Sequence, residues 1–153
     1  MAVPVKLPIP SPDEFRASLR RHGLKATRQR MAVHAVMSEL VHATAEEVTE
    51  TLRQRGASVT QTSVYNILNQ LSDNRIYSRR NGSGNKMVFD VRVRPHVHLY
   101  DRENNYYRDV VDEELVQEVN AHLKRRRFKG YTIECIDIQF IVRPTGRGKK
   151  SSV

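Results

Sequence analysis

Two histidines separated by one residue, His96-Val97-His98, are the feature of this sequence that most directly suggests chemistry. Side chains alternate between the two faces of a strand, so both imidazoles would lie on one face and could chelate a metal ion. Asp90 and Asp109 would add carboxylate oxygens, and such a mixed set suits Fe(II), Mn(II), Co(II) or Zn(II). His42 would add a ligand from the N-terminal half and link the two halves of the chain. The two histidines alone do not establish that a metal is bound, because a His-x-His sequence in a strand is often incidental. Asp90 and Asp109 can also have ordinary structural roles.

Four segments in the first half of the chain have the apolar spacing of helices that pack on a core. The first carries acidic residues in its opening turn, where they complement the helix dipole. The others follow threonines that can cap a helix, namely Thr27, Thr44 (with Glu47 at capping-box spacing) and either Thr60 or Thr62. The predicted helices are 12–23, 27–40, 44–56 and 60–71.

The pattern changes to alternation after residue 75. An alternating segment, 75–80, and a short apolar one, 86–91, flank the turn sequence Asn81-Gly82-Ser83-Gly84-Asn85, which indicates a β-hairpin. Helices followed by such a hairpin are typical of a winged helix, whose last helix enters the major groove of DNA. Ordinary α+β packing is the alternative.

The second half is predicted to be a small β-β-α-β unit. Strands are expected at 96–101 and 105–111, a helix from Asp112, and a long strand at 131–142. A unit of this size leaves a sheet edge and one face uncovered, which predicts dimerisation. The fold class is therefore α+β, with an N-terminal winged-helix DNA-binding domain and a small C-terminal α/β dimerisation domain. The predicted parts are an extended arm (1–12), the winged-helix domain (13–91), a linker (92–95), the dimerisation domain (96–143) and a basic tail (144–153).

Composition points to a polyanionic partner. The 153 residues include 26 Lys and Arg against 17 Asp and Glu, a net charge of +9, and nucleic acid is the first candidate. The halves 1–90 and 91–153 carry similar net charges of +5 and +4, so charge alone assigns DNA contact to neither. One cysteine, Cys135, excludes an intramolecular disulfide and a zinc site built on a Cys-x-x-Cys pair. No membrane span or signal peptide is recognised, so a cytoplasmic protein is expected.

Five motifs in order resemble the ferric uptake regulator family. They are Leu24-Lys25-Ala26-Thr27-Arg28-Gln29-Arg30, His42-Ala43-Thr44-Ala45-Glu46-Glu47, Thr62-Ser63-Val64-Tyr65, Phe89-Asp90 and His96-Val97-His98. Together they cover roughly residues 13–143. The resemblance implies a homodimeric, metal-responsive transcriptional repressor that binds double-stranded operator DNA and is not an enzyme.

The same resemblance implies the functional residues. The regulatory metal, Fe(II) or Mn(II) with Zn(II) as an in vitro substitute, would be held by His42, Asp90, His96, His98 and Asp109. For DNA we predict that Thr62, Tyr65 and Asn66 of the fourth helix lie nearest the bases. Phosphates would be contacted by Lys25, Arg28, Arg30 and the wing residues Arg79, Arg80 and Lys86. An aspartate at position 109 is similar to the peroxide-sensing branch of the family, in which iron-dependent oxidation of a ligand histidine releases the repressor from DNA.

The chain also departs from the family pattern. Asp101 and Asn104 stand where the first cysteine pair of a structural zinc site would fall, and Arg143 onward has no second pair, so this zinc is predicted to be absent. Asn66 stands where the family often has arginine, and asparagine pairs with adenine rather than guanine. A cysteine-poor, haem-responsive relative makes haem a further candidate.

The predicted function is a metal-dependent DNA-binding repressor that responds to peroxide. Regulation of metal uptake in response to iron or haem is the first alternative. The alternatives of other classes are a small non-haem iron enzyme using His96 and His98, and an architectural DNA-binding protein in which the histidines are incidental.

Overall fold

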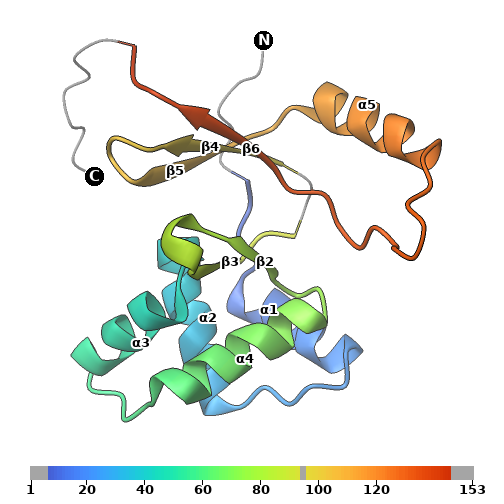
Figure 1. Cartoon of the computed structure of the whole chain (residues 1–153). Helices are drawn as coiled ribbons and strands as arrows, with labels where there is room; N and C mark the ends of the chain where they lie inside the picture. Colours follow the sequence, from blue (N-terminus) through green and yellow to red (C-terminus); the bar gives the residue numbers. More distant parts are fainter. Residues whose placement is uncertain (1–6, 94–95, 146–153) are drawn as a thin grey trace. The chain divides into compact units, whose positions relative to one another are not determined.

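The computed structural model describes residues 7–93 and 96–145 (Figure 1). The chain divides into two compact units, one formed by residues 8–93 and the other by residues from 94 onward together with the first seven. The predicted linker is described only at residues 92 and 93. The first six residues of the predicted arm and residues 146–153 of the predicted tail lie outside the described residues.

The first unit contains the four predicted helices, α1 (Pro12–Arg21), α2 (Arg28–Leu40), α3 (Ala45–Gln54) and α4 (Gln61–Asp73). Thr27 caps α2, and Thr44 caps α3 in a full capping box with Glu47. The cap of α4 is Thr60, whose side chain accepts a hydrogen bond from the Ser63 amide, so of the two candidates Thr62 is not the cap. Thr62 therefore lies in the first helical turn with its side chain exposed.

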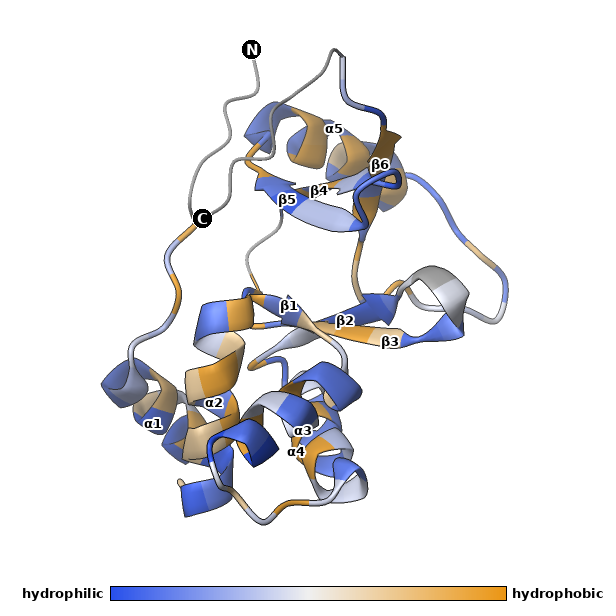
Figure 2. Cartoon of the chain, turned by 90° about the vertical axis from the view of Figure 1, so that its left-hand side faces the viewer, coloured by the Kyte–Doolittle hydropathy of each residue, from blue (hydrophilic) through white to orange (hydrophobic). Residues whose placement is uncertain are grey.

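The apolar stripes of these helices converge on one core. Its largest fully buried members include Phe15, Met37, Leu68 and Phe89. Figure 2 shows the hydrophobic residues of the helices, in orange, alternating with hydrophilic ones in blue. Burial of this many apolar side chains is the main stabilising contribution to the unit.

His34 is a buried polar residue in that core, which the helix pattern did not predict. Its ring stacks on Phe15 at 3.9 Å between centroids, and its Nδ1 lies 2.8 Å from the Tyr77 hydroxyl. Its Nε2 lies 2.9 Å from the carbonyl oxygen of Pro10. Burial lowers the pKa of His34, so the residue stays neutral and holds the segment before α1 to α2 and to the start of the wing.

A three-stranded antiparallel sheet completes the unit, in the order β1 (His42–Ala43), β3 (Met87–Asp90), β2 (Ser78–Asn81). Strands β2 and β3 are the predicted hairpin, with a short 3-10 turn, Ser83–Asn85, between them. Strand β1 was not predicted, because two residues are too few to show alternation. It places His42 directly opposite Asp90 on β3.

The second unit has the predicted β-β-α-β order. Its elements are β4 (Val97–Asp101), β5 (Tyr106–Val110), α5 (Glu113–Lys124) and β6 (Ile138–Val142). The sheet order is β5-β4-β6, with β5 antiparallel and β6 parallel to the central β4.

The long strand predicted at 131–142 is wrong over most of its length. Tyr131 makes only an isolated bridge with Phe128, and residues 132–137 have no regular structure. A strand needs a hydrogen-bonding neighbour, and β4 begins at Val97, which pairs with Ile138. Residues before Ile138 therefore have no strand beside them in the described chain.

Apolar side chains of the second unit are largely uncovered. No residue of α5 is fully buried, and Tyr131, Phe140 and Ile141 are exposed. This differs from the close-packed first unit and is typical of a surface that a second chain covers. Among the described helices, none combines the length and apolar character that crossing a membrane requires.

Candidate metal centre and nucleic-acid interface

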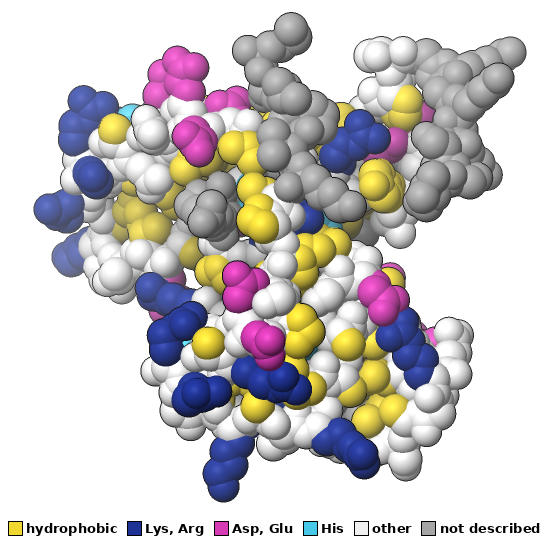
Figure 3. All heavy atoms as spheres, turned by 180° about the vertical axis from the view of Figure 1, so that it is seen from behind, with side chains coloured by type: hydrophobic (Ala, Val, Ile, Leu, Met, Phe, Trp, Pro, Cys, Tyr) yellow, Lys and Arg dark blue, Asp and Glu magenta, His cyan; other side chains and the backbone are white. Residues whose placement is uncertain are grey.

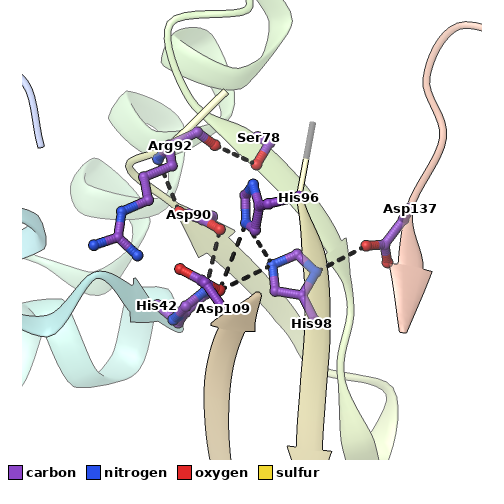
Figure 4. Close-up of polar contacts among 8 residues, drawn as sticks. All are labelled: His42, Ser78, Asp90, Arg92, His96, His98, Asp109 and Asp137. Atoms are coloured by element: carbon purple, nitrogen blue, oxygen red, sulfur yellow. Dashed lines mark hydrogen bonds and ion pairs between the residues drawn. The ribbon is translucent and has the colours of Figure 1, made fainter. Parts of the chain in front are cut away.

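His42 and Asp90 form a buried pair in the first unit (Figure 4). His42 Nε2 lies 3.1 Å from Asp90 Oδ2, and the side chains are 11% and 4% exposed. Val41, just before, has φ 64° and ψ −56°, a strained conformation for a β-branched residue. Its carbonyl accepts a hydrogen bond from the Val91 amide, which holds the chain reversal between α2 and β1 and so brings His42 to Asp90.

The backbone of Arg92 fixes the Asp90 carboxylate. Its Oδ1 accepts a hydrogen bond from the Arg92 amide at 2.8 Å, while the Arg92 carbonyl accepts one from the Ser78 hydroxyl at 2.9 Å. These bonds orient Asp90 so that its other oxygen, Oδ2, faces His42. One imidazole nitrogen and one carboxylate oxygen are thus placed side by side.

His96, His98 and Asp109 form the corresponding group in the second unit. The two Nε2 atoms lie 2.9 Å apart, and Asp109 Oδ1 lies 3.6 Å from that of His96 and 3.7 Å from that of His98. The antiparallel register of β4 and β5 pairs His98 with Asp109. His96, just before β4, lies on the same side, with its ring 4.4 Å from that of His98 between centroids. All three side chains are buried. The structure therefore brings together three of the predicted ligands in this unit and two in the other.

The donor chemistry of these three residues fits a divalent transition metal. Metal–nitrogen and metal–oxygen bonds of about 2.1 Å place neighbouring ligand atoms about 3.0 to 3.4 Å apart, depending on the angle between the bonds. The separations in the structure are 2.9, 3.6 and 3.7 Å, within a few tenths of an ångström of that range without a metal present. Two neutral imidazoles and one carboxylate would hold Fe(II), Mn(II) or Zn(II), whereas Mg(II) and Ca(II) prefer oxygen ligands alone.

Asp137 also contacts this group, a role the sequence analysis did not assign to it. Its Oδ1 lies 3.1 Å from His98 Nδ1, on the side of the ring opposite to Nε2 (Figure 4). The available signal was the alternation of residues 137 and 139 on one side of the predicted strand. Which strand lies beside β6 could not be read from that alternation.

Asp101 and Asn104 close the turn between β4 and β5 with hydrogen bonds. Asp101 Oδ1 accepts from the amides of Glu103 and Asn104, and Asp101 Oδ2 accepts from the Asn104 side chain at 2.7 Å. These bonds lower the pKa of Asp101. The turn that the resemblance associates with a cysteine pair is thus held by an aspartate and an asparagine.

Helix α4 presents a polar face on the side opposite the core. Thr62, Tyr65 and Asn66 are exposed, while Val64, Leu68 and Leu71 are buried. The Tyr65 ring meets Phe89 edge-on at 6.1 Å, so its position is fixed although it is 41% exposed. These three predicted base-contacting residues share one helix face because their spacing of three and four residues matches the helical repeat.

The predicted basic contacts fall into two groups. Lys25 and Arg28 are exposed beside the start of α2. Arg30 and Arg79 instead bind side chains of α4, Arg30 through Gln70, and Arg79 through Asn69 at 2.9 Å and Asp73 at 2.8 Å. Arg79 thereby joins the wing strand β2 to α4.

Two further residues named for DNA contact lie in the wing. Arg80 on β2 is partly buried, and Lys86 pairs with Glu46 of α3 at 2.9 Å. In the second unit, the five Lys and Arg residues between 124 and 129 are all exposed. Figure 3 shows Lys and Arg side chains gathered at one edge of this unit.

Comparison with known proteins gives one consistent match. The model of the "Ferric uptake regulator family" matches residues 21–138. The chain is 34% identical over 80 residues to the "Ferric uptake regulation protein" of Haemophilus influenzae, an alignment covering 51% of this chain and 55% of that protein. It is 33% identical over 81 residues to the Escherichia coli K12 protein of the same name, an alignment covering 52% of this chain and 55% of that protein. The chain thus spans about half the length of these curated relatives.

Solved structures match over more of the chain. The ferric uptake regulator of Vibrio cholerae superposes with a TM-score of 0.66 at 23% identity, covering 84% of this chain and 98% of that one. The Pseudomonas aeruginosa regulator with manganese superposes with a TM-score of 0.67 at 23% identity, covering 86% of this chain and 98% of that one. These likenesses confirm the predicted α+β fold class.

Proposed function

Because this chain belongs to the ferric uptake regulator family, we propose that it is a metal-dependent, DNA-binding transcriptional repressor. The main observation behind the proposal is that His96 Nε2, His98 Nε2 and Asp109 Oδ1 lie close together. The other unit of the same chain has the exposed polar face of α4. The family consists of DNA-binding regulators, which favours this function over that of a small iron enzyme.

We infer that one metal ion takes ligands from both units. His42 and Asp90 offer one nitrogen and one oxygen, and the second unit offers two nitrogens and one oxygen. A metal that binds all five prefers whichever arrangement of the units lets them coordinate together, and it shifts the population toward that arrangement. If that arrangement is the one that binds DNA, the metal acts as corepressor.

The geometry favours a small ion over haem. An axial histidine presents its free nitrogen to the centre of a wide, flat porphyrin, which needs open space before that nitrogen. Here His98 Nε2 faces His96 Nε2 at 2.9 Å and Asp109 Oδ1 at 3.7 Å. Fe(II) and Mn(II) are the ions we propose, with Zn(II) as an in vitro substitute.

The proposed DNA contacts follow from exposure. Thr62, Tyr65 and Asn66 would face base edges in the major groove, and Lys25 and Arg28 would bind phosphates. Arg30 and Arg79 already hold side chains of α4, so we assign them to fixing the recognition helix while their charge adds to phosphate attraction. The uncovered apolar side chains of the second unit would be covered in a homodimer.

The DNA proposal predicts selection of a defined sequence. We expect the Mn(II)-loaded protein to enrich a duplex with two inverted half-sites from a random pool, because a two-fold symmetric dimer presents two copies of α4. The enriched pool is read by sequencing, and a pool processed without protein is the control. Recovery of DNA with no sequence preference would contradict this proposal and favour an architectural protein.

Peroxide is the signal that we propose for this site. When bound, ferrous iron would supply one electron to hydrogen peroxide, and the ligand imidazoles are the oxidisable groups nearest to the metal. Overall, one oxygen atom of hydrogen peroxide would be added to a histidine and the other would leave as water. Oxidation of His96 or His98 would remove a good ligand and weaken metal binding. The carboxylate at Asp109, in the position where the peroxide-sensing branch has aspartate, supports this choice over iron or haem sensing.

We expect peroxide to add the mass of one oxygen atom to a histidine in the Fe(II)-loaded protein. The measurement is mass spectrometry of the peptides that contain His42 or the pair His96 and His98. The Mn(II)-loaded protein is the control and should remain unmodified under the same dose. Unmodified histidines in the Fe(II)-loaded protein would overturn peroxide sensing and leave iron as the signal.

A further inference from the structure

Asp137 lies immediately before β6, beside His98 of β4, one of the proposed metal ligands. Strand β6 runs parallel to β4 with Gln139 opposite His98, and paired residues of neighbouring strands point to the same face. Asp137 directly precedes this strand, and its Oδ1 lies 3.1 Å from His98 Nδ1. Figure 4 shows the Asp137 carboxylate directed at the His98 ring from the side of β6.

The contact between these two side chains fixes which nitrogen of His98 carries the proton. Asp137 Oδ1 lies 3.1 Å from His98 Nδ1, and an ionised carboxylate can only accept a hydrogen bond. His98 Nδ1 therefore donates, and in the neutral imidazole Nε2 then carries a lone pair. That lone pair lies on the side of the ring facing His96 Nε2 and Asp109 Oδ1.

We propose that Asp137 is a positioning residue of the metal site, which holds His98 in the tautomer and orientation that metal binding requires. This inference rests on the proposed metal site and adds to it a residue outside the five ligands. The contact depends on the backbone, because the parallel pairing of β6 with β4 brings the residue before β6 close to His98. A carboxylate in this place also makes the imidazole a better electron donor to the metal.

The expected loss of metal affinity can be judged from carboxylates that hydrogen-bond to ligand histidines in other metal sites. Loss of a carboxylate that orients a ligand histidine typically costs about 10–100-fold in metal affinity. The Asp137 side chain is 42% exposed, so water and salt weaken its interaction with His98. We therefore expect Asp137→Ala to raise the Kd for Mn(II) by about 10-fold, the lower end of that range.

The test measures the Kd for Mn(II) of the full chain by competition with a chelator. Glu134→Gln is the matched control, because it removes a carboxylate from the same segment, 132–137, three residues from Asp137. We expect this control to bind Mn(II) as the unchanged protein does. Asp137→Asn keeps the size and an acceptor oxygen but removes the charge, so its Kd should fall between those of the Ala variant and the unchanged protein.

A second measurement separates positioning from a general loss of structure. Nitrogen-15 NMR of the metal-free protein should show His98 protonated at Nδ1, and Asp137→Ala should shift it toward a mixture of tautomers. Thermal unfolding of the metal-free variant should match that of Glu134→Gln. An unchanged tautomer in Asp137→Ala would overturn the proposed role.

His98→Ala distinguishes the failure of this inference from the failure of the metal site. If His98→Ala weakens Mn(II) binding and Asp137→Ala leaves the Kd within twofold, the role of Asp137 is wrong and the metal site stands. If His98→Ala itself leaves the Kd unchanged, the metal is not bound here, and both proposals fail.

Discussion

Replacement of both His96 and His98 by alanine is expected to weaken Mn(II) binding by more than the roughly 100-fold that loss of one orienting contact can cost. The two substitutions remove both imidazole nitrogens of the second unit and leave Asp109 as the one proposed ligand there. A carboxylate alone is a poor substitute for imidazole toward Fe(II) or Zn(II). For Mn(II), the variant loses two of the three donor atoms that this unit offers. The double variant should also gain no DNA affinity when Mn(II) is added.

The Mn(II) affinity measurement needs two controls, one for the loss of any histidine and one for correct folding of the variants. His122→Ala removes an exposed histidine of α5 from the same unit and should leave the Kd unchanged. Circular dichroism and thermal unfolding of the metal-free proteins check that the variants fold, and Asp109→Asn provides an independent substitution of nearly the same size if the double variant is unstable. Mn(II) binding by the folded double variant at the affinity of the unchanged protein would contradict the assigned site.

Asn66→Ala and Arg28→Ala are expected to damage DNA binding in different ways. Asn66 is exposed on α4, and an asparagine paired with adenine contributes about 1–3 kcal/mol of discrimination against the wrong base. Its loss should therefore reduce the preference at one base pair of each half-site by about 5–150-fold, since about 1.4 kcal/mol corresponds to a factor of ten. Arg28, exposed at the start of α2, should instead weaken binding to all sequences, because phosphates carry no sequence information.

These two outcomes are read from equilibrium binding to the selected duplex and to duplexes with one base pair changed. Arg28→Ala should also reduce the slope of log K against log salt by about 1. Gln54→Ala, which removes an exposed amide from α3, is the control and should alter neither quantity. A uniform loss for Asn66→Ala, with base preference retained, would show that this residue does not read sequence.

Much of the first unit follows from local sequence rules. Capping at Thr27 and Thr44 and the apolar spacing of the helices were confirmed, because those signals act within a few residues. His34 was missed because its partners Pro10 and Tyr77 lie 24 and 43 residues away. A polar residue on an apolar helix face gives no local sign that such partners exist.

The second unit shows why its site was only partly predictable. The alternation expected over 96–101 correctly placed His96 and His98 side by side, although β4 begins at Val97, and the β4–β5 register added Asp109. The contribution of Asp137 depends on the parallel pairing of β6 with β4, and no local pattern encodes which strands become neighbours. The same long-range pairing explains why the last strand begins only at Ile138, although the alternating pattern in the sequence begins at residue 131.

The most direct test of metal-dependent repression is the affinity of the full chain for its selected duplex, measured with Mn(II) and again after chelation of the metal at the same ionic strength. We expect affinity to fall on metal removal by about 5–150-fold, the usual range for coupling between two binding sites. Because binding linkage is reciprocal, the duplex should raise the affinity for Mn(II) by the same factor. Equal affinity for the duplex with and without the metal would contradict a metal-dependent repressor.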